Sequence, residues 1–516
     1  MDIFENLNLI PTKFESGWHK TIGDSFLYMP QSGARVSADD LVLELYREVF
    51  FEKRGEGKAL KRIDPEEMQE DGKPVFEDYE KQSLYMARGR TKQTAMHQKQ
   101  NDFYTPLYPS LARRSWFRKN EVRAIVNYLL NVIAQHLSTD MSKKDNFIEI
   151  FYKALLGKCD DSLIGGDIAG LKIDRLKGCV SEDDGRNKLS DLCEYASKSL
   201  FKLQSKEPDS LSKTIFDDLK NLCELESSLD RLQWMSLLKT FLRFSTSVWL
   251  LSQMKMTIIL RDKLLSILAG DSDCDVDATW VDAMSQSRHR QLFKPSMTAK
   301  KHQLEEYVQQ YVKARNELNI LVAVVEKYSP GLDWSGKTLK LHEGSKSDLS
   351  ILELMTRGFN MRKDLANDLK GSDLRVMLTR HCESFSAWRA TLNTNVNPTK
   401  SYREYLRPLR KMDQGDDGGH LIIPNRHNKS EYKIFPGNLT LRLITYLAAK
   451  ANTNKKLILA DVENHFKSYG LDFGEKGEIR GMLISSLQDM GLLKGSPDAD
   501  DSVAVENPYP VKSTSV

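Results

Sequence analysis

Cysteine is scarce in this chain of 516 residues, and the six that occur are scattered: Cys159, Cys179, Cys193, Cys223, Cys274 and Cys382. No two of them form the CxxC pair that zinc sites and redox motifs use. A secreted disulfide framework and a structural zinc site are both disfavoured, and reduced thiols of a cytoplasmic protein are the simpler interpretation. The ten histidines are dispersed as well, without an HxH or HExxH motif. The sequence therefore predicts no metal site.

Long apolar runs are absent too. The strongest candidate for a membrane span, Phe244 to Met254, lies between Arg243 and Lys255. A membrane-spanning helix needs about twenty apolar residues, so this shorter segment predicts a buried helix. Residues 1–5 show no basic region followed by an apolar one, which argues against a secretory signal. We expect a cytoplasmic protein without a membrane partner.

The composition is 40% hydrophobic and 28% charged, with a net charge of +3. These values are typical of a folded protein, and the length predicts several domains. Apolar residues recur at helical spacing through the middle of the chain, which predicts a mainly α fold with a multi-helical bundle core. We expect a core helix pair within 230–268. The other expected helices are 39–51, capped near Ser37, one beginning at Asn120, and 189–203, 211–229, 297–328 and 348–392.

The expected organisation has four parts. Residues 1–119 form a small mixed N-terminal region with a basic arm, and 120–296 the helical core. Residues 297–412 form a long helix and further helical bundle, and 420–510 a β-hairpin followed by a winged helix-turn-helix domain. The glycine- and aspartate-rich segment 413–419 is the clearest linker. Because such a segment offers few groups for packing, we expect the C-terminal unit to be separable.

The winged-helix prediction rests on three short helical patterns followed by a hairpin. The first helix is expected to be capped by Asn438, the second to end at Gly470 and the third at Gly491, since glycine readily takes the left-handed conformation that ends helices. A short strand, a turn at 496–498 and the alternating pair Val503 and Val505 complete the pattern. A hairpin made of residues 420–423 and 432–435 is expected before it.

The charge of this domain argues against simple DNA reading. Residues 438–510 contain eight Lys and Arg and ten Asp and Glu, so eight minus ten gives −2. Phosphate binding needs the opposite sign. Lys476 and Arg480 could still point from the third helix into a DNA groove, but the charge favours protein docking.

The strongest candidate for DNA binding is the basic stretch 81–123. It contains ten Lys and Arg against two acidic residues, so ten minus two gives +8, and aromatic residues interleave with the cations. A nucleic-acid-binding surface typically combines cations that bind phosphates with aromatic rings that stack on bases. An arm that docks on an acidic protein is the alternative. The candidate DNA contacts are Arg88, Arg90, Lys92, Arg113, Arg114, Trp116, Arg118, Lys119 and Arg123.

No catalytic site emerges from the motifs, so we expect neither an enzyme nor a cofactor. Residues 331–338 match the phosphate-binding pattern GxxxxGK[ST], with Gly336, Lys337 and Thr338 as candidate nucleotide contacts. The apolar pattern predicts a helix that ends near Tyr328, where a nucleotide-binding loop would need a buried strand directly before it, and this favours a surface turn. The aspartates of 271–282 have the spacing of a calcium loop, but Val276 replaces the glycine that the sharp turn needs.

The segment from Gly481 to Leu493, with residues 496–507 after it, resembles the C-terminal winged helix of accessory proteins in bacterial anti-phage operons. Among these proteins it resembles the phosphorothioation-dependent restriction component of the DptG kind. The resemblance implies a non-catalytic adaptor that works beside a large ATPase or nuclease on foreign DNA. Two alternatives stay open: a protein scaffold that never contacts DNA, and a nucleotide hydrolase built around Lys337.

Overall fold

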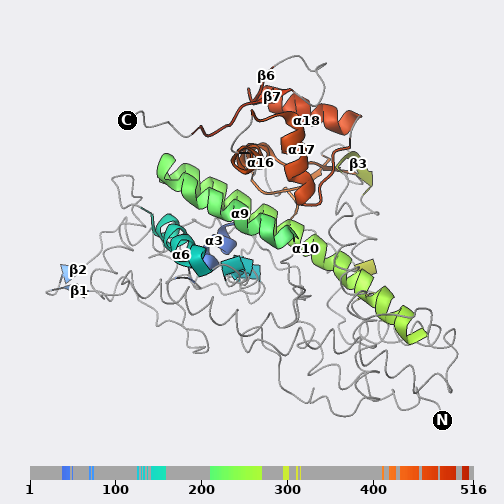
Figure 1. The fold of residues 1–516 in the computed structure, drawn as a ribbon, viewed down its shortest axis with the longest axis horizontal. Helices are drawn as coiled ribbons and strands as arrows, with labels where there is room; N and C mark the ends of the chain where they lie inside the picture. The colour runs from blue at the N-terminus through green and yellow to red at the C-terminus, as the bar shows by residue number, and fades with distance from the viewer. Residues whose placement is uncertain are drawn as a thin grey trace, which may run out of the picture.

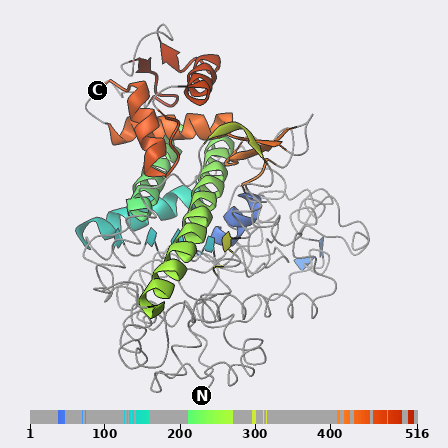
Figure 2. The same ribbon diagram turned by 90° about the vertical axis from the view of Figure 1, so that its right-hand side faces the viewer.

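The computed structural model describes part of the chain, and helices make up most of that part, as predicted for a mainly α protein. Two layers of described elements lie on opposite sides of a pair of helices, α9 (Ser210–Leu225) and α10 (Arg231–Ala269) (Figures 1 and 2). The described residues are 38–46, 49, 69–70, 73–74, eight positions within 125–137, 141–157, 210–269, 295–300, 310–311, 314, 409–411, 418–425, 431–452, 456–474, 477–494 and 503–510.

The central element is helix α10, which runs from Arg231 to Ala269 over 39 residues. The Asp230 carboxylate accepts the backbone N–H of Gln233 at 2.8 Å, which is how an N-cap residue begins a helix. The sequence has neither glycine nor proline between Arg231 and Leu268 to end it. The predicted pair of core helices within 230–268 is therefore wrong, because the pattern forms one continuous helix.

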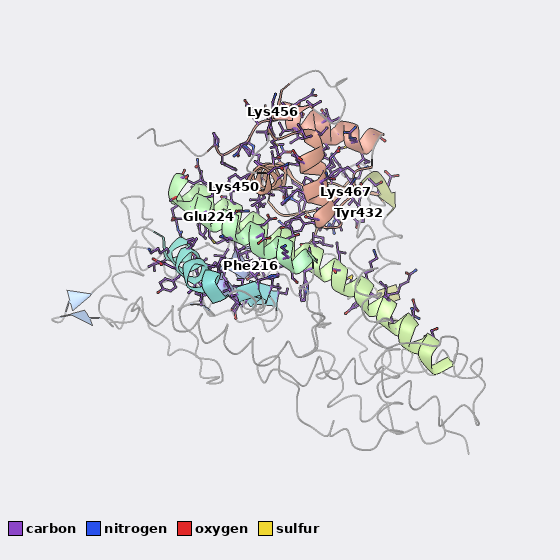
Figure 3. The ribbon with its side chains drawn as sticks, viewed as in Figure 1. Phe216, Glu224, Tyr432, Lys450, Lys456 and Lys467 are labelled. Carbon is purple, nitrogen blue, oxygen red and sulfur yellow. The ribbon has the colours of Figure 1, made fainter. Side chains whose placement is uncertain are left out.

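Helix α9 (Ser210–Leu225) precedes α10 and ends in a 3-10 turn, Glu226–Ser228, as predicted for residues 211–229. Trp234 of α10 donates its indole N–H to the carbonyl of Leu222 at 2.9 Å, which joins the two helices near their connection. Figure 3 shows Phe216 on the side of α9 that faces helix α6 (Met141–Leu156), where its ring lies 4.7 Å from that of Phe147.

On this same side lies helix α3 (Ala38–Tyr46), which begins directly after Ser37 and confirms the start of the first predicted helix. Arg231 joins it to α6, because its guanidinium donates to the carbonyls of Ala154 and Leu155 at 2.6 Å and to the Tyr46 hydroxyl at 3.1 Å. Among the described residues of 125–137, all are helical and buried, in agreement with the helix predicted from Asn120.

A three-stranded antiparallel sheet joins two distant parts of the chain. Its order is β3 (Ser296–Lys300), β5 (Glu431–Ile434) and β4 (Ile422–Pro424). The β4–β5 pair confirms the predicted hairpin. Strand β3 was not predicted, and it contradicts the helix expected over 297–328 at its start. The sheet therefore joins strand β3, which begins at the expected boundary between 120–296 and 297–412, to strands of the expected part 420–510. A separate short hairpin, β1 (Gln69–Glu70) with β2 (Lys73–Pro74), lies in the mixed N-terminal region.

The last described elements form what we call the C-terminal module, residues 437–510. Its helices are α16 (Asn438–Ala451), α17 (Leu459–Ser468) and α18 (Glu478–Asp489). Strands β6 (Leu493–Lys494) and β7 (Ala504–Val505) follow as an antiparallel hairpin, and Ile458 bridges to Ala504 beside it. The N-cap of α16 is Gly437 rather than the predicted Asn438. Both predicted stop residues adopt the left-handed conformation, with φ of 77° at Gly470 and 71° at Gly491.

Candidate functional site

The C-terminal module lies directly against α9 and α10 (Figure 2). Aromatic side chains pack in this contact. Phe244 of α10 lies beside Phe466 and Tyr469, with ring centroids 6.5 Å and 5.0 Å apart in edge-to-face arrangements. All three rings are buried. Edge-to-face pairs stabilise a contact beyond the area that they remove from water, so the module and the helices beneath it share one apolar core.

Three polar side chains, which we call the Asp218 cluster, lie in the same contact: Asp218 and Tyr469 are buried, and the His465 side chain is 10% exposed. The Tyr469 hydroxyl donates to Asp218 Oδ2 at 2.6 Å, and His465 Nε2 lies 2.9 Å from that same oxygen. The Asp218 side chain is only 3% exposed. Burial, and then the negative charge of Asp218, raise the pKa of Tyr469 well above its ordinary value. Tyr469 therefore keeps its proton and remains a donor throughout the neutral range.

A second contact lies next to the C-terminal module, at residues 418–420. Arg243 of α10 donates to the carbonyl of Gly418 at 2.9 Å and to that of Arg410 at 2.6 Å. Gly419 has a φ of 72°, and its N–H donates to the hydroxyl of Thr440 at 2.9 Å. A Cβ added at Gly418 would lie 2.5 Å from the Thr240 hydroxyl.

The predicted linker 413–419 is therefore packed tightly at its C-terminal end, and the expectation that this segment makes little packing contact is wrong at residues 418 and 419. His420, which follows, is 1% exposed. The glycines of this segment do not make it a flexible linker at this end. Because glycine has no side chain, the backbone at residues 418 and 419 can approach α10 closely. Residues 413–417 lie outside the described part of the chain.

Helix α18 is the third helix of the module, and its inner side is held by Leu483 and Leu487, which are fully buried. Arg480 forms a pair with Glu463 of α17, with Nε and Oε1 2.6 Å apart, and the two side chains are 15% and 13% exposed. The outer side is formed by small and acidic residues that are exposed: Glu478, Gly481, Ser485 and Asp489.

Of the predicted groove-binding pair, only Arg480 belongs to the described residues, since Lys476 lies outside them. Arg480 is engaged by Glu463 instead of extending from the outer side of α18. Other cations of the module occupy separate places at the ends of α16 and α17 and before Leu457 (Figure 3): Lys450, Lys456 and Lys467.

The remaining predicted site residues all lie outside the described part of the chain, and these predictions stay untested. They are the DNA-contact candidates Arg88, Arg90, Lys92, Arg113, Arg114, Trp116, Arg118, Lys119 and Arg123, and the nucleotide candidates Gly336, Lys337 and Thr338. The tip of the β6–β7 hairpin, residues 495–502, also lies outside it.

Within the described residues, no group of His, Cys, Asp and Glu side chains has the arrangement of a metal site. Cys223 is a buried free thiol, and burial raises its pKa. A thiol with a raised pKa is a poor nucleophile at neutral pH. None of the described helices is both long enough and apolar enough to cross a membrane.

Sequence reasoning missed the Asp218 cluster. The signal for one half of it was present, because His465 and Tyr469 are four residues apart and share a helix face with Phe466 and Val462 nearby. The other half had no signal, since nothing in the sequence relates residue 218 to residues 465 and 469. Comparison with known proteins adds no assignment: no family model, no curated protein and no solved structure matches the chain.

Proposed function

We propose that the protein is a non-catalytic adaptor in a bacterial anti-phage defence complex that targets DNA, and that its C-terminal module is a winged helix-turn-helix domain that docks a partner protein. The order of elements supports the domain assignment. A bridging residue, Ile458, lies between the first and second helices, and a hairpin follows the third. A winged-helix domain has this order, with the hairpin as its wing.

The main support for protein docking is the set of side chains on the outer side of α18. Winged-helix domains that read DNA place this helix in the major groove, where cations neutralise phosphates and bond to bases. Here the described outer side presents Glu478 and Asp489, and the guanidinium of Arg480 is engaged by Glu463. Moving Arg480 to a phosphate would leave the part-buried Glu463 carboxylate without its donor, and this loss opposes DNA binding by Arg480.

Small side chains on the same surface suit a protein partner. Gly481 and Ser485 are one helical turn apart, and a Cβ added at Gly481 would meet nothing within 4 Å. Such positions let another backbone approach α18 closely. The partner proposed from the resemblance is a larger ATPase or nuclease subunit. DNA contact is assigned to the basic stretch 81–123, which supplies the cations that the described outer side of α18 does not present.

Gly481→Arg tests the docking surface, because the side chain would project into open space from a helix that gains from losing glycine. We expect the variant to fold normally and to lose co-purification with the proposed large ATPase or nuclease subunit, while DNA binding by the full chain is retained. Asn464→Arg adds the same charge at an exposed position on α17 and is the matched control. Retained co-purification in Gly481→Arg, or gain of specific DNA binding, would contradict the proposal.

A further inference from the structure

The Asp218 cluster joins the C-terminal module to α9 through two donors on one oxygen. His465 lies in the last turn of α17, and Tyr469 is the residue that caps its end. Both side chains point at Asp218 Oδ2, at 2.9 Å and 2.6 Å. Both contacts therefore converge on one carboxylate oxygen, which accepts the hydrogen bond from the Tyr469 hydroxyl. The end of α17 is thereby tied to a single atom of α9.

A second directed contact lies one turn further along α9. The Tyr446 hydroxyl of α16 donates to the carbonyl of Asn221 at 3.2 Å. Two helices of the module are thus tied to two points on α9 that are three residues apart. Two such points fix both the position of the module along α9 and its rotation about that helix.

The neighbouring apolar contacts are less selective. Phe244 packs against Phe466 and Tyr469, and apolar burial is proportional to area and has no direction. By contrast, a shift of α17 along α9 would break both bonds to Asp218 and leave a buried acceptor unsatisfied. Buried polar groups are penalised strongly in every arrangement that does not satisfy them.

We infer that the Asp218 cluster is a positioning device: it selects one orientation of the C-terminal module on the helical core and contributes little to overall stability. A buried polar cluster is often no more stabilising than well-packed apolar residues of similar volume, but it discriminates against alternative arrangements. The selected orientation determines the direction in which α18 faces. This inference concerns the contact itself and holds whether or not α18 docks a protein.

The test separates stability from orientation with an apolar triple variant, Asp218→Leu, His465→Leu and Tyr469→Phe. Spin labels on genetically encoded keto amino acids at Leu232 and Ser485, both exposed, report the distance between the start of α10 and α18 without using the native thiols. We expect the triple variant to unfold at the same urea concentration as the parent or higher, while its distance distribution broadens or splits.

Two further variants separate the effect of apolar packing from that of the Asp218 cluster. Phe466→Leu weakens the apolar core of the contact and leaves the cluster intact, so we expect lower stability with a single narrow distance. His465→Leu alone leaves Asp218 without one donor, so we expect both lower stability and a broader distribution. A triple variant with the parent's single narrow distance would overturn the inference, as would one that has lost the C-terminal module's fold.

Discussion

Stability should depend on pH through His136, whose ring stacks on Phe216 of α9 with centroids 5.1 Å apart. Burial, and then the positive charge of Lys213, lower the pKa of His136 from 6.5 to about 4. A backbone hydrogen bond at Ser212 acts in the opposite direction and offsets them only in part. In the folded protein the imidazole therefore stays neutral at pH values where the unfolded chain binds a proton.

Proton linkage gives the direction and the size of the effect. Between pH 6.5 and about 4 the unfolded state binds more protons at this site, so the contribution is fully present above pH 6.5 and is lost as the pH falls. The change in pKa corresponds to at most roughly 3 kcal/mol at pH 4. His136 keeps 9% of its surface exposed. Because nearby water screens the charge, we expect about 1.5–2.5 kcal/mol.

His136→Phe removes the titration and retains an aromatic ring against Phe216. Urea denaturation at about pH 7 and about pH 4.5 then gives the loss of unfolding free energy for parent and variant, and we expect the parent to lose more. Lys213→Gln is the second variant, since removing its charge should raise the pKa of His136 and reduce the loss. Equal losses in the parent and in His136→Phe would refute this reasoning.

Three other expectations concern the basic stretch, the nucleotide motif and the packed glycine. Replacing Arg113, Arg114, Arg118 and Lys119 by glutamate should abolish DNA gel shifts at low salt without changing the circular dichroism, because phosphate contacts depend on those cations. DNA binding equal to that of the parent would favour the scaffold alternative. Calorimetry should detect no ATP binding by the parent, whereas binding that Lys337→Ala removes would establish a nucleotide site. Gly419→Ala should lower the unfolding free energy by roughly 2–4 kcal/mol, because φ is 72° and the new Cβ would lie 2.6 Å from Arg243 Cβ. Gly491→Ala, with φ of 71° and open space, should cost only about 1 kcal/mol in the same urea titration.

Local patterns predicted the elements of the C-terminal module well. Apolar residues at helical spacing placed α16, α17 and α18, and Gly470 and Gly491 marked where the last two stop. These features are readable because the helix period and the left-handed glycine are both properties of a few neighbouring residues. The same holds for α9, whose apolar face is regular.

Non-local contacts account for what was missed. Strand β3 has the sequence Ser-Met-Thr-Ala-Lys, without clear alternation, and becomes a strand by pairing with β5 more than a hundred residues later. Asp218 is separated from His465 by 247 positions. Helix α10 was divided in two because a circumference that is apolar nearly all round gives no periodic signal for its ends.

The long separation between Asp218 and its donors has a consequence for biosynthesis. Ribosomes add about 5–20 residues per second, so roughly 12 to 50 s pass between the appearance of Asp218 and that of Tyr469. Throughout this interval the Asp218 side chain on α9 and the ring of Phe244 on α10 lack Tyr469, which contacts both in the folded protein. A chain that terminates early would expose both, and such surfaces are what chaperones and proteases recognise. The buried contact between α9, α10 and the C-terminal module can therefore form only after residues 465–469 have been added to the chain.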